Sequence, residues 1–293
     1  MRLAFLGTPL AAVVSLGALC DHGHDVAVVV TRPDRRRSRG AKESPSPVKI
    51  EAHARGIPVV HRVADLDSFD VERGVVVAYG AMISAAVLER VPMLNVHFSL
   101  LPRWRGAAPV ERAILAGDRE TGVAIMSLEA GLDTGPVHLE RRVEIGDATL
   151  SDLVDRLARL GAQALLDVLG DPALLDHPVA QTGEATYATK LDAETFHLDA
   201  TKSAEENLRI IRLERAWVLV DERRVRLIEA HRFAGEAVVV EPGVLERRDG
   251  DVVLGVRGGS LALGSVRPEG SRTMSAADWW RGRPRSNDVV RWR

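Results

Sequence analysis

The chain has 293 residues, 46% apolar and 27% charged, which is the composition of an ordinary globular protein with one large domain or two. The net charge of −2 excludes a general electrostatic case for nucleic-acid binding. The single cysteine, Cys20, excludes an internal disulfide and indicates a reducing compartment, so a cytoplasmic location is expected.

The N-terminus has to be distinguished from a leader sequence. Met1 and Arg2 precede an apolar stretch that runs to Cys20, as in a short signal peptide. Gly7-Thr8-Pro9 interrupts this stretch, and residues 21–30 continue directly into a strand pattern. Leu3–Gly7 is therefore predicted to be a buried first strand. The chain has no run of 18 apolar residues, so neither a transmembrane helix nor a membrane partner is expected.

Strand and helix patterns alternate through the first half of the chain. Strands are predicted at Leu3–Gly7, Asp25–Thr31, Gly74–Ala78, Leu94–Phe98 and Val123–Leu128, and helices at Leu10–Cys20, Ser46–Arg55, Ser84–Arg90, Ala108–Ala116 and Thr149–Leu169. Continuous apolar strands between helices are typical of a mostly parallel sheet that is covered on both faces. The fold class is therefore α/β, with a Rossmann-like N-terminal domain and ligands at the carboxyl ends of the strands.

The pattern changes after Gly170. A helix at Ala204–Ile211 is followed by short strands between Gly turns, at Gly243–Glu246, Val252–Val256 and Leu261–Val266. These short strands predict a small OB-like β-barrel. The resulting division is a catalytic domain at 1–186, a linker at 187–202 and a second domain at 203–293, in which 17 Lys+Arg stand against 14 Asp+Glu.

The strongest functional signal is the stretch from Asn95 to Pro109. Asn95 and His97 are two residues apart on a predicted strand, so their side chains point to the same face. Asp133 follows in a Gly-rich loop. An amide, an imidazole and a carboxylate together suit acyl-group chemistry. Taken singly, His97 could be a satisfied core histidine and Asp133 an ordinary turn residue.

Two other kinds of site are not supported by the sequence. His22-Gly23-His24 lacks the ligand spacing of a metal site, so no metal is expected. Gly7-Thr8-Pro9 is not the GxGxxG fingerprint of a dinucleotide site. The Arg-rich run from Arg32 to Lys42 attracts phosphates if it is a binding loop, and is a solvated loop otherwise.

Taken together, these residues resemble the folate-dependent formyltransferase family. The resemblance runs nearly end to end and is carried by Phe5–Pro9, Thr31–Lys49, Val76–Gly80, Asn95–Pro109, Gly117–Val123, Gly131–Gly135, Thr186–Leu191 and Thr273–Ala276. The Asn-x-His signature with a later Asp is specific to formyl transfer from 10-formyltetrahydrofolate. The basic loop and the C-terminal domain are similar to the branch of the family that acts on tRNA.

The resemblance implies a role for each matching residue. Asn95 and His97 would donate hydrogen bonds to the oxyanion, while Asp133 would hold the imidazole and take a proton from the amine. The folate would lie along Ser99, Leu100, Leu101 and Pro102. Arg36, Arg37, Arg39 and Lys42 would contact the acceptor end of the tRNA. The implied reaction is formylation of the methionine on initiator methionyl-tRNA, for translation initiation, by a monomeric, metal-free enzyme.

The chain departs from the tRNA branch at one place. The Asn-Pro-Trp-Pro segment after the first helix of the C-terminal domain is replaced by Arg212–Trp217, which has no proline. A sugar-nucleotide N-formyltransferase with the same Asn-His-Asp chemistry is therefore an alternative, although the Arg-rich loop with Ser44-Pro45-Ser46-Pro47 favours tRNA. An RNA-binding relative without activity, and hydrolysis of the formyl-folate by water, are further alternatives.

Overall fold

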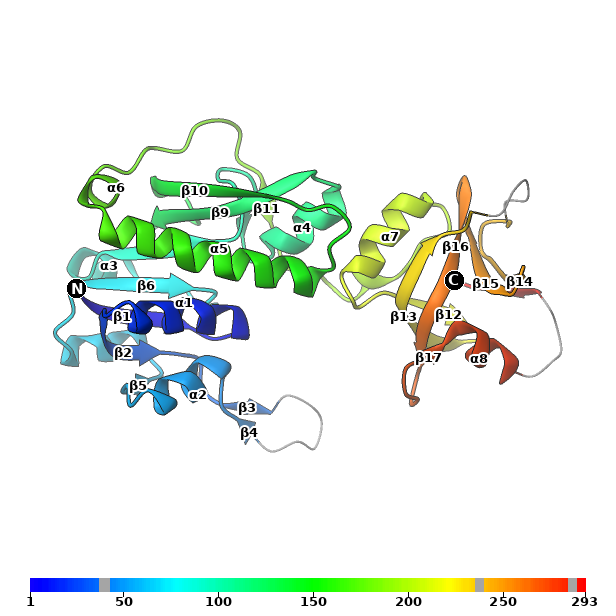
Figure 1. Cartoon of the computed structure of the whole chain (residues 1–293), viewed down its shortest axis with the longest axis horizontal. Coiled ribbons are helices and arrows are strands. Elements are labelled where there is room, and N and C mark those ends of the chain that lie inside the picture. Colours follow the sequence, from blue (N-terminus) through cyan, green and yellow to red (C-terminus); the bar gives the residue numbers. More distant parts are fainter. Residues whose placement is uncertain (37–42, 235–239, 284–288) are drawn as a thin grey trace. The chain divides into compact units, whose positions relative to one another are not determined.

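A computed structural model describes residues 1–36, 43–234, 240–283 and 289–293 (Figure 1). For residues 35 and 36 it describes the backbone alone. The chain forms two compact units. The first, here called the N-terminal unit, comprises residues 1–112, 119–146 and 152–189. The second, the C-terminal unit, comprises 113–118, 147–151 and 190–293. Each is described by itself below.

The N-terminal unit is built on a seven-stranded sheet with the order β10-β9-β7-β6-β1-β2-β5. The strands are β1 Arg2–Gly7, β2 Asp25–Val30, β5 Val59–Val60, β6 Arg73–Val77, β7 Met93–His97, β9 Glu120–Ser127 and β10 Val137–Glu144. The five strands from β7 to β5 are parallel, whereas β9 is antiparallel to β7 and β10 to β9. The predicted α/β class with a mostly parallel sheet is confirmed.

The sequence patterns missed two strands of this sheet, the two-residue β5 and the longer β10. Strand β10 lies at the edge of the sheet, and its second half carries Glu140, Arg141, Arg142 and Glu144. An edge strand with charged side chains has no continuous apolar run, so nothing in its sequence separates it from a loop.

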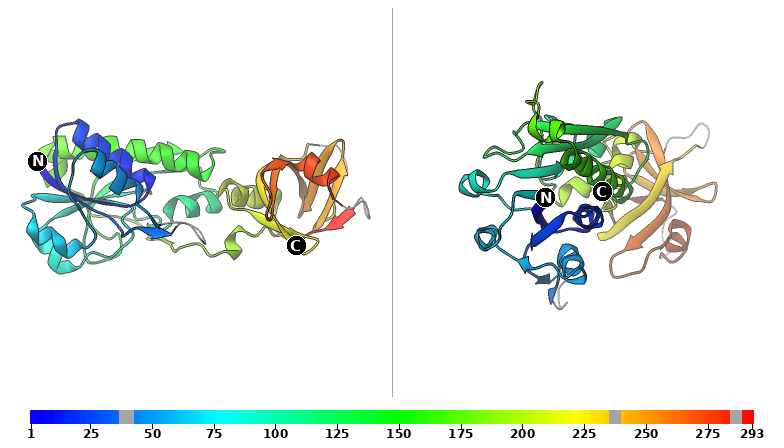
Figure 2. Two further views of the ribbon diagram at one scale, coloured as in Figure 1. Left: turned by 90° about the horizontal axis from the view of Figure 1, so that it is seen from below. Right: turned by 60° about the vertical axis from the view of Figure 1, so that its left-hand side comes forward.

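Helices cover both faces of this sheet (Figure 2). They are α1 Leu10–Asp21, α2 Pro47–Ala54, η1 Val63–Ser68, α3 Ala85–Arg90, α4 Pro109–Ala116, α5 Leu150–Gly170 and α6 Pro172–Asp176. One core cluster joins Leu66 of η1 and Val87 of α3 to Leu6 and Met93 in the sheet. The long helix α5 lies against the other face, so side chains of β7 alternate between these two environments.

The close approach of α5 to the sheet depends on Gly161. A Cβ atom at this position would lie 2.7 Å from Cγ1 of Val96 and 3.2 Å from Cγ1 of Val123. Both valines are buried, so neither methyl group has open space to move into. Glycine therefore lets the helix backbone pack directly on β7 and β9, which fixes the face that Asn95 and His97 do not use.

We expect the substitution Gly161→Ala to lower the free energy of unfolding by about 1 kcal/mol. Alanine improves helix propensity by about 1 kcal/mol, but overpacking a rigid core costs about 1–3 kcal/mol. Gly170→Ala, at the other end of α5, is the matched control, since its Cβ would meet no atom within 4 Å. Urea unfolding followed by circular dichroism compares the two. A stabilised Gly161→Ala protein would contradict the packing account.

The C-terminal unit contains a second seven-stranded sheet, which is antiparallel. Its strands are β12 Trp217–Val220, β13 Arg223–Arg232, β14 Val244–Arg248, β15 Asp251–Val256, β16 Gly259–Pro268, β17 Met274–Ser275 and β18 Val289–Arg291. The two ends of the sheet meet at an isolated bridge between Val220 and Trp292. The sheet is thus nearly closed, which confirms the predicted barrel.

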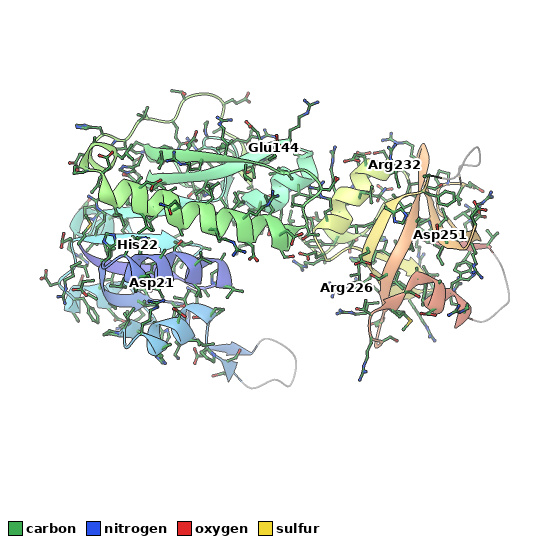
Figure 3. The ribbon with its side chains drawn as sticks, viewed as in Figure 1. Asp21, His22, Glu144, Arg226, Arg232 and Asp251 are labelled. Atoms are coloured by element: carbon green, nitrogen blue, oxygen red, sulfur yellow. The ribbon has the colours of Figure 1, made fainter. Side chains whose placement is uncertain are left out.

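Two helices accompany the barrel, α7 Ala204–Arg212 and α8 Ala276–Arg281, together with the short η2 Glu194–Phe196. A capping box formed by Ser203 and Glu206 begins α7. Strand β13 was not predicted, although Arg224 and Arg226 alternate with its buried Val225 and Leu227 as in a half-buried strand. Figure 3 shows two of its charged side chains, Arg226 and Arg232.

Candidate active site

Asn95 and His97 lie near the carboxyl end of β7, on the same face of the sheet. Val96 between them points the opposite way and packs against Gly161 of α5. Backbone pairing holds Asn95 between Val76 of β6 and Met126 of β9. His97 is 5% exposed, whereas Asn95 is partly exposed. The strand therefore presents an amide and an imidazole side by side, as the two-residue spacing predicts.

The hydrogen bonds of His97 define the role of each ring nitrogen. Nε2 lies 2.9 Å from the carbonyl oxygen of Trp104. A carbonyl only accepts, so Nε2 carries a proton and donates it. Nδ1 is 3.7 Å from Oδ2 of Asp133, which is longer than a hydrogen bond. Nδ1 is thus the nitrogen that is left to exchange a proton or to donate to a reacting group.

The loop after β7 is held in place by contacts with a later segment of the chain. The amide of Trp104 donates to Oγ1 of Thr186 at 2.9 Å, and the amide of Arg105 donates to the Thr186 carbonyl at 2.9 Å. The short strands β8 Arg105–Gly106 and β11 Tyr187–Ala188 then pair in parallel. This support fixes the Trp104 carbonyl and, through it, the orientation of the His97 ring.

The four residues predicted to line the folate site have different environments. Ser99 is fully buried, and its hydroxyl donates to the carbonyl of Arg103 at 2.6 Å. Leu101 is also buried and packs on Ala124 and Met126. Leu100 and Pro102 are partly exposed. Direct contact with a ligand would therefore come from Leu100, Pro102 and the backbone, while Ser99 and Leu101 give the loop its shape.

Asp133 is brought to His97 by a tight turn. Its backbone has a φ of 49°, in the left-handed region that L-residues rarely adopt. The glycine after it is needed, because a Cβ at Gly135 would lie 1.9 Å from the carbonyl oxygen of Ser127. The amide of Gly106 donates to Asp133 Oδ2 at 2.7 Å. The three residues predicted from separate motifs thus form one cluster within the N-terminal unit.

Sequence reasoning missed the residues that hold this cluster, in particular Gln181 and Thr186. Both belong to the stretch between α6 and β11, where the chain shows turn residues and little periodicity. In the sequence, Thr186–Leu191 resembles a segment of the family, but this resemblance assigns no role to Thr186 and does not include Gln181. Hydrogen bonds with isolated side chains leave no pattern that a single sequence can reveal.

A pair formed by the partly exposed Ser127 and the buried His138 lies directly beside the Asp133 turn. Nδ1 of His138 donates to the carbonyl of Leu174 at 2.9 Å, so Nε2 accepts from the Ser127 hydroxyl at 2.8 Å. Burial lowers the pKa of His138 below its ordinary value of 6.5, with a smaller opposing effect from the Leu174 hydrogen bond. The neutral ring thus joins β9, β10 and α6 at the base of the turn.

This pair makes stability sensitive to acid. Because the pKa of His138 is lower in the folded state, the unfolded chain binds a proton first as the pH falls below 6.5. The neutral His138 ring therefore contributes to the free energy of unfolding above pH 6.5, and this contribution is lost as the pH falls from 6.5 to the folded-state pKa. We expect His138→Gln to flatten this part of the unfolding free energy plotted against pH. A wild-type slope in the variant, measured by urea unfolding at pH 5 to 8, would contradict the account.

Only the base of the predicted tRNA-binding loop is described. Arg36 belongs to the two-residue strand β3 Arg35–Arg36, which pairs with β4 Glu43–Ser44, while Arg37, Arg39 and Lys42 lie outside the described residues. Below the loop, Nζ of Lys49 lies 2.8 Å from Oδ2 of Asp34. Thr31 and Ser46 share a buried hydroxyl–hydroxyl hydrogen bond of 2.8 Å. These two contacts join the chain after β2, at Thr31 and Asp34, to the start of α2.

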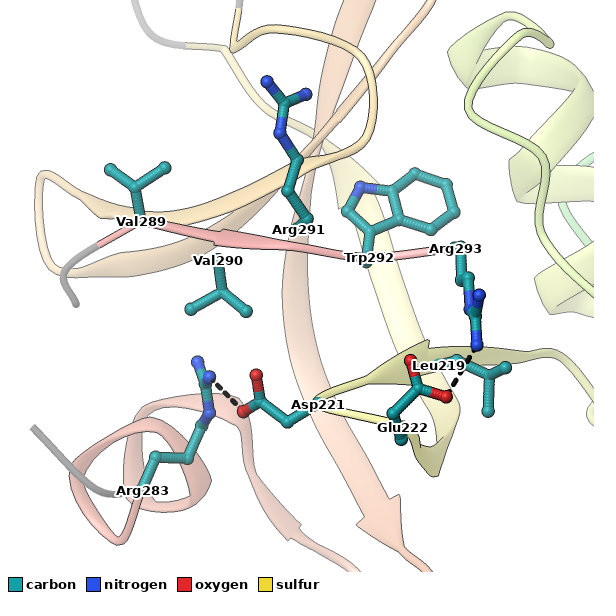
Figure 4. A pocket seen from close by; sticks show the side chains of 9 residues that line it. All are labelled: Leu219, Asp221, Glu222, Arg283, Val289, Val290, Arg291, Trp292 and Arg293. Carbon is teal, nitrogen blue, oxygen red and sulfur yellow. Dashed lines mark hydrogen bonds and ion pairs between the residues drawn. The ribbon is translucent and has the colours of Figure 1, made fainter. Parts of the chain in front are cut away.

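The C-terminal unit has a cavity of about 410 Å³ at the meeting point of β12 and β18 (Figure 4). Its charged lining is paired, with Arg283 2.6 Å from Asp221 and Arg293 2.6 Å from Glu222.

Among the described residues, no three or more His, Cys, Asp or Glu side chains gather as metal ligands would. No helix in the described ranges has the length and apolarity needed to cross a bilayer.

Comparison with known proteins identifies the family of the chain. Residues 1–169 match the family model for formyl transferase, and residues 190–284 match that for its C-terminal domain. A methionyl-tRNA formyltransferase of Xanthomonas axonopodis pv. citri is 44% identical over 306 residues, covering 97% of this chain and 98% of the relative. That of Roseobacter denitrificans is 41% identical and covers 96% of both. The chain belongs to the methionyl-tRNA formyltransferase family.

Solved structures place this formyltransferase among distant relatives that share its fold. A methionyl-tRNA formyltransferase from Clostridium thermocellum has a TM-score of 0.56 at 14% identity, covering 81% of this chain and 96% of that one. The sugar 3N-formyl transferase WlaRD has a TM-score of 0.68 at 16% identity and covers 93% and 99%. HypX from Aquifex aeolicus, solved with tetrahydrofolic acid, gives 0.68 at 18% identity, covering 95% and 46%.

Proposed function

We propose that this protein transfers the formyl group of 10-formyltetrahydrofolate to the free amino group of methionine on initiator methionyl-tRNA, for translation initiation. Support comes from relatives that are methionyl-tRNA formyltransferases and are 41–44% identical over at least 96% of the chain. The observation that carries the chemistry is the cluster in which His97 Nδ1 lies 3.7 Å from Asp133 Oδ2, with Asn95 on the same strand face.

The cluster suits stabilisation of a tetrahedral intermediate. When the amine attacks the formyl carbon, the carbonyl oxygen becomes an oxyanion that needs donors fixed in advance. The Asn95 amide and the Nδ1–H of a protonated His97 can supply them. The Nε2–H of His97 already donates to Trp104, so the ring cannot turn freely toward another partner. The Asp133 carboxylate, 3.7 Å from Nδ1, would attract the charge of the ring in that protonated form.

The reaction needs one proton moved from amine to folate. The attacking nitrogen gains a bond to the formyl carbon and loses a proton, while the bond from that carbon to N10 breaks and N10 takes a proton. Asp133, through a water molecule, is the group proposed to accept and return this proton. The proton count balances, so no metal, oxidant or further reactant is required.

The substrates are proposed to meet at the C-terminal edge of the parallel strands. The folate would lie along Ser99, Leu100, Leu101 and Pro102, with Leu100 and Pro102 making the direct contacts. Arg36, Arg37, Arg39 and Lys42 would engage the acceptor end of the tRNA, since arginine and lysine position nucleic acids through phosphate. The proposal assigns catalysis to residues 1–186, a linker to 187–202 and tRNA contact to 203–293, in a cytoplasmic monomer.

A sugar nucleotide is the competing amine substrate. The observation in its favour is the absence of prolines from Arg212–Trp217, where the tRNA branch has Asn-Pro-Trp-Pro. In the structure this segment runs directly from the end of α7 into β12, with Leu213 and Ala216 buried. An N-formyltransferase from Helicobacter canadensis has been solved with folinic acid and dTDP-3-aminofucose, but at 17% identity it shows the fold alone.

Purified protein should formylate charged initiator methionyl-tRNA with 10-formyltetrahydrofolate, and leave uncharged tRNA and dTDP-amino sugars unchanged. We expect His97→Ala to lower kcat by roughly 100-fold, the loss seen when an oxyanion donor is removed. His53→Ala, at an exposed position on α2, is the matched control. Both are measured as labelled formyl-methionine released from tRNA.

The outcomes separate the substrate from the site. Transfer to an amino sugar but not to methionyl-tRNA would replace the proposed substrate and keep the chemistry. Transfer to methionyl-tRNA at an undiminished rate by the His97→Ala enzyme would remove His97 from the mechanism.

The basic loop gives a second prediction, which concerns salt. If Arg39 contacts a phosphate, Arg39→Ala should weaken tRNA binding and reduce the slope of log K against log salt by about one unit. Arg159→Ala, on the exposed side of α5, removes the same charge elsewhere and should leave the slope unchanged. Filter binding between 50 and 300 mM KCl measures both, and equal slopes for the two variants would place the loop away from the tRNA.

A further inference from the structure

We propose that Gln181 is a positioning residue for Asp133, and that Arg105 orients Gln181 for this task. The inference rests on the proposed function, because it assigns a support to the carboxylate of that site. Gln181 lies in the segment between α6 and β11, 48 positions after Asp133, and its side chain reaches the Asp133 turn from outside the turn itself.

The Asp133 turn needs support from elsewhere in the fold. A non-glycine residue at a φ of 49° adopts a conformation that is disfavoured by sterics and persists only when its surroundings fix it. The turn is also crowded, since a Cβ at Gly131 would lie 2.3 Å from Oγ1 of Thr134. Without external hydrogen bonds, such a turn would relax and carry the Asp133 carboxylate away from His97.

Gln181 supplies those hydrogen bonds. Its Nε2 donates to the carbonyl oxygen of Asp133 at 2.8 Å and to that of Gly135 at 2.8 Å. An amide group has two N–H donors, so a single side chain satisfies both carbonyls. The two acceptors lie on either side of Thr134, so Gln181 clamps the turn by bonding to the backbone before and after that residue.

Arg105 determines which way the Gln181 amide faces. Its Nε and Nη2 lie 3.1 and 2.6 Å from Oε1 of Gln181, and a guanidinium only donates. Oε1 must therefore face Arg105, which directs Nε2 toward the turn. The next residue, Gly106, donates its amide to Asp133 Oδ2 at 2.7 Å. The strand Arg105–Gly106 thus holds the carboxylate directly and the turn through Gln181.

The clamp predicts a specific loss in the chemical step. A displacement of about 1 Å in a catalytic group costs on the order of 100-fold in rate, so partial loosening should cost about 10-fold. Gln181→Met keeps the length and shape of the side chain but removes both donors. Gln181→Glu keeps the Arg105 pair and also removes the donors. We expect kcat to fall about 10-fold in both variants, with the KM for tRNA and for folate within twofold of wild type.

Two controls separate positioning from general damage. Gln163→Met, on the exposed face of α5, makes the same substitution away from the site and should leave kcat unchanged. Asp133→Asn should lose less in the Gln181→Met background than in the wild type, because both changes act on one carboxylate. Wild-type kcat in both Gln181 variants, full additivity with Asp133→Asn, or a kcat loss that follows a lowered Tm would each overturn the inference.

A second measurement does not depend on the substrate. The Gly106 amide donates to Asp133 Oδ2, so its hydrogen exchange reports on the position of the carboxylate. Exchange at Gly106 should be at least about 10-fold faster in Gln181→Met than in wild type or Gln163→Met, as read by NMR or mass spectrometry. Unchanged exchange would overturn the inference. Faster exchange in a protein that does not formylate methionyl-tRNA would retain the clamp while the proposed function fails.

Discussion

The hydrogen bond from His97 Nε2 to the Trp104 carbonyl is the contact on which the rest of the site depends. It joins the end of a buried parallel strand to the loop that follows it, and it assigns a proton to one ring nitrogen. The other nitrogen, Nδ1, then faces Asp133. Strand pairing holds the backbone of His97, and the loop after β7 holds its ring through Nε2. The imidazole is therefore oriented before any substrate binds.

One returning segment gives the loop and the Asp133 turn a common support. Thr186 and Ala188 bond the backbone of the loop at Trp104, Arg105 and Ala107, while Gln181 bonds the turn. The loop and the turn are therefore held by residues that lie within eight positions of each other. A change in the path of this segment would therefore act on the loop and on the turn at the same time.

The sequence allows four of the five parallel strands, the helices α1 to α5 and α7, and the Asn95–His97 pair to be predicted, because each follows from local periodicity. Strand β7 is apolar and continuous apart from those two side chains, and i, i+2 spacing alone places them together. The partnership of His97 with Asp133 came from family resemblance, since 36 positions separate them. Gln181 could not be found, because its role follows from four hydrogen bonds across the fold. Strand β10 was missed because charged side chains interrupt its apolar pattern, whereas the alternation in β13 was a usable signal.

The departure at Arg212–Trp217 concerns the barrel rather than the chemistry. Trp217 begins β12, and its ring stacks on His197 at 4.0 Å with an interplanar angle of 4°. The Arg224 guanidinium lies 3.9 Å from the same indole, and Nε1 donates to the Ala193 carbonyl at 3.3 Å. These contacts secure the chain segment before α7 to the barrel by stacking and cation–π attraction. Asn95, His97 and Asp133 all belong to the other unit. The segment without prolines therefore lies outside the unit that holds these three residues.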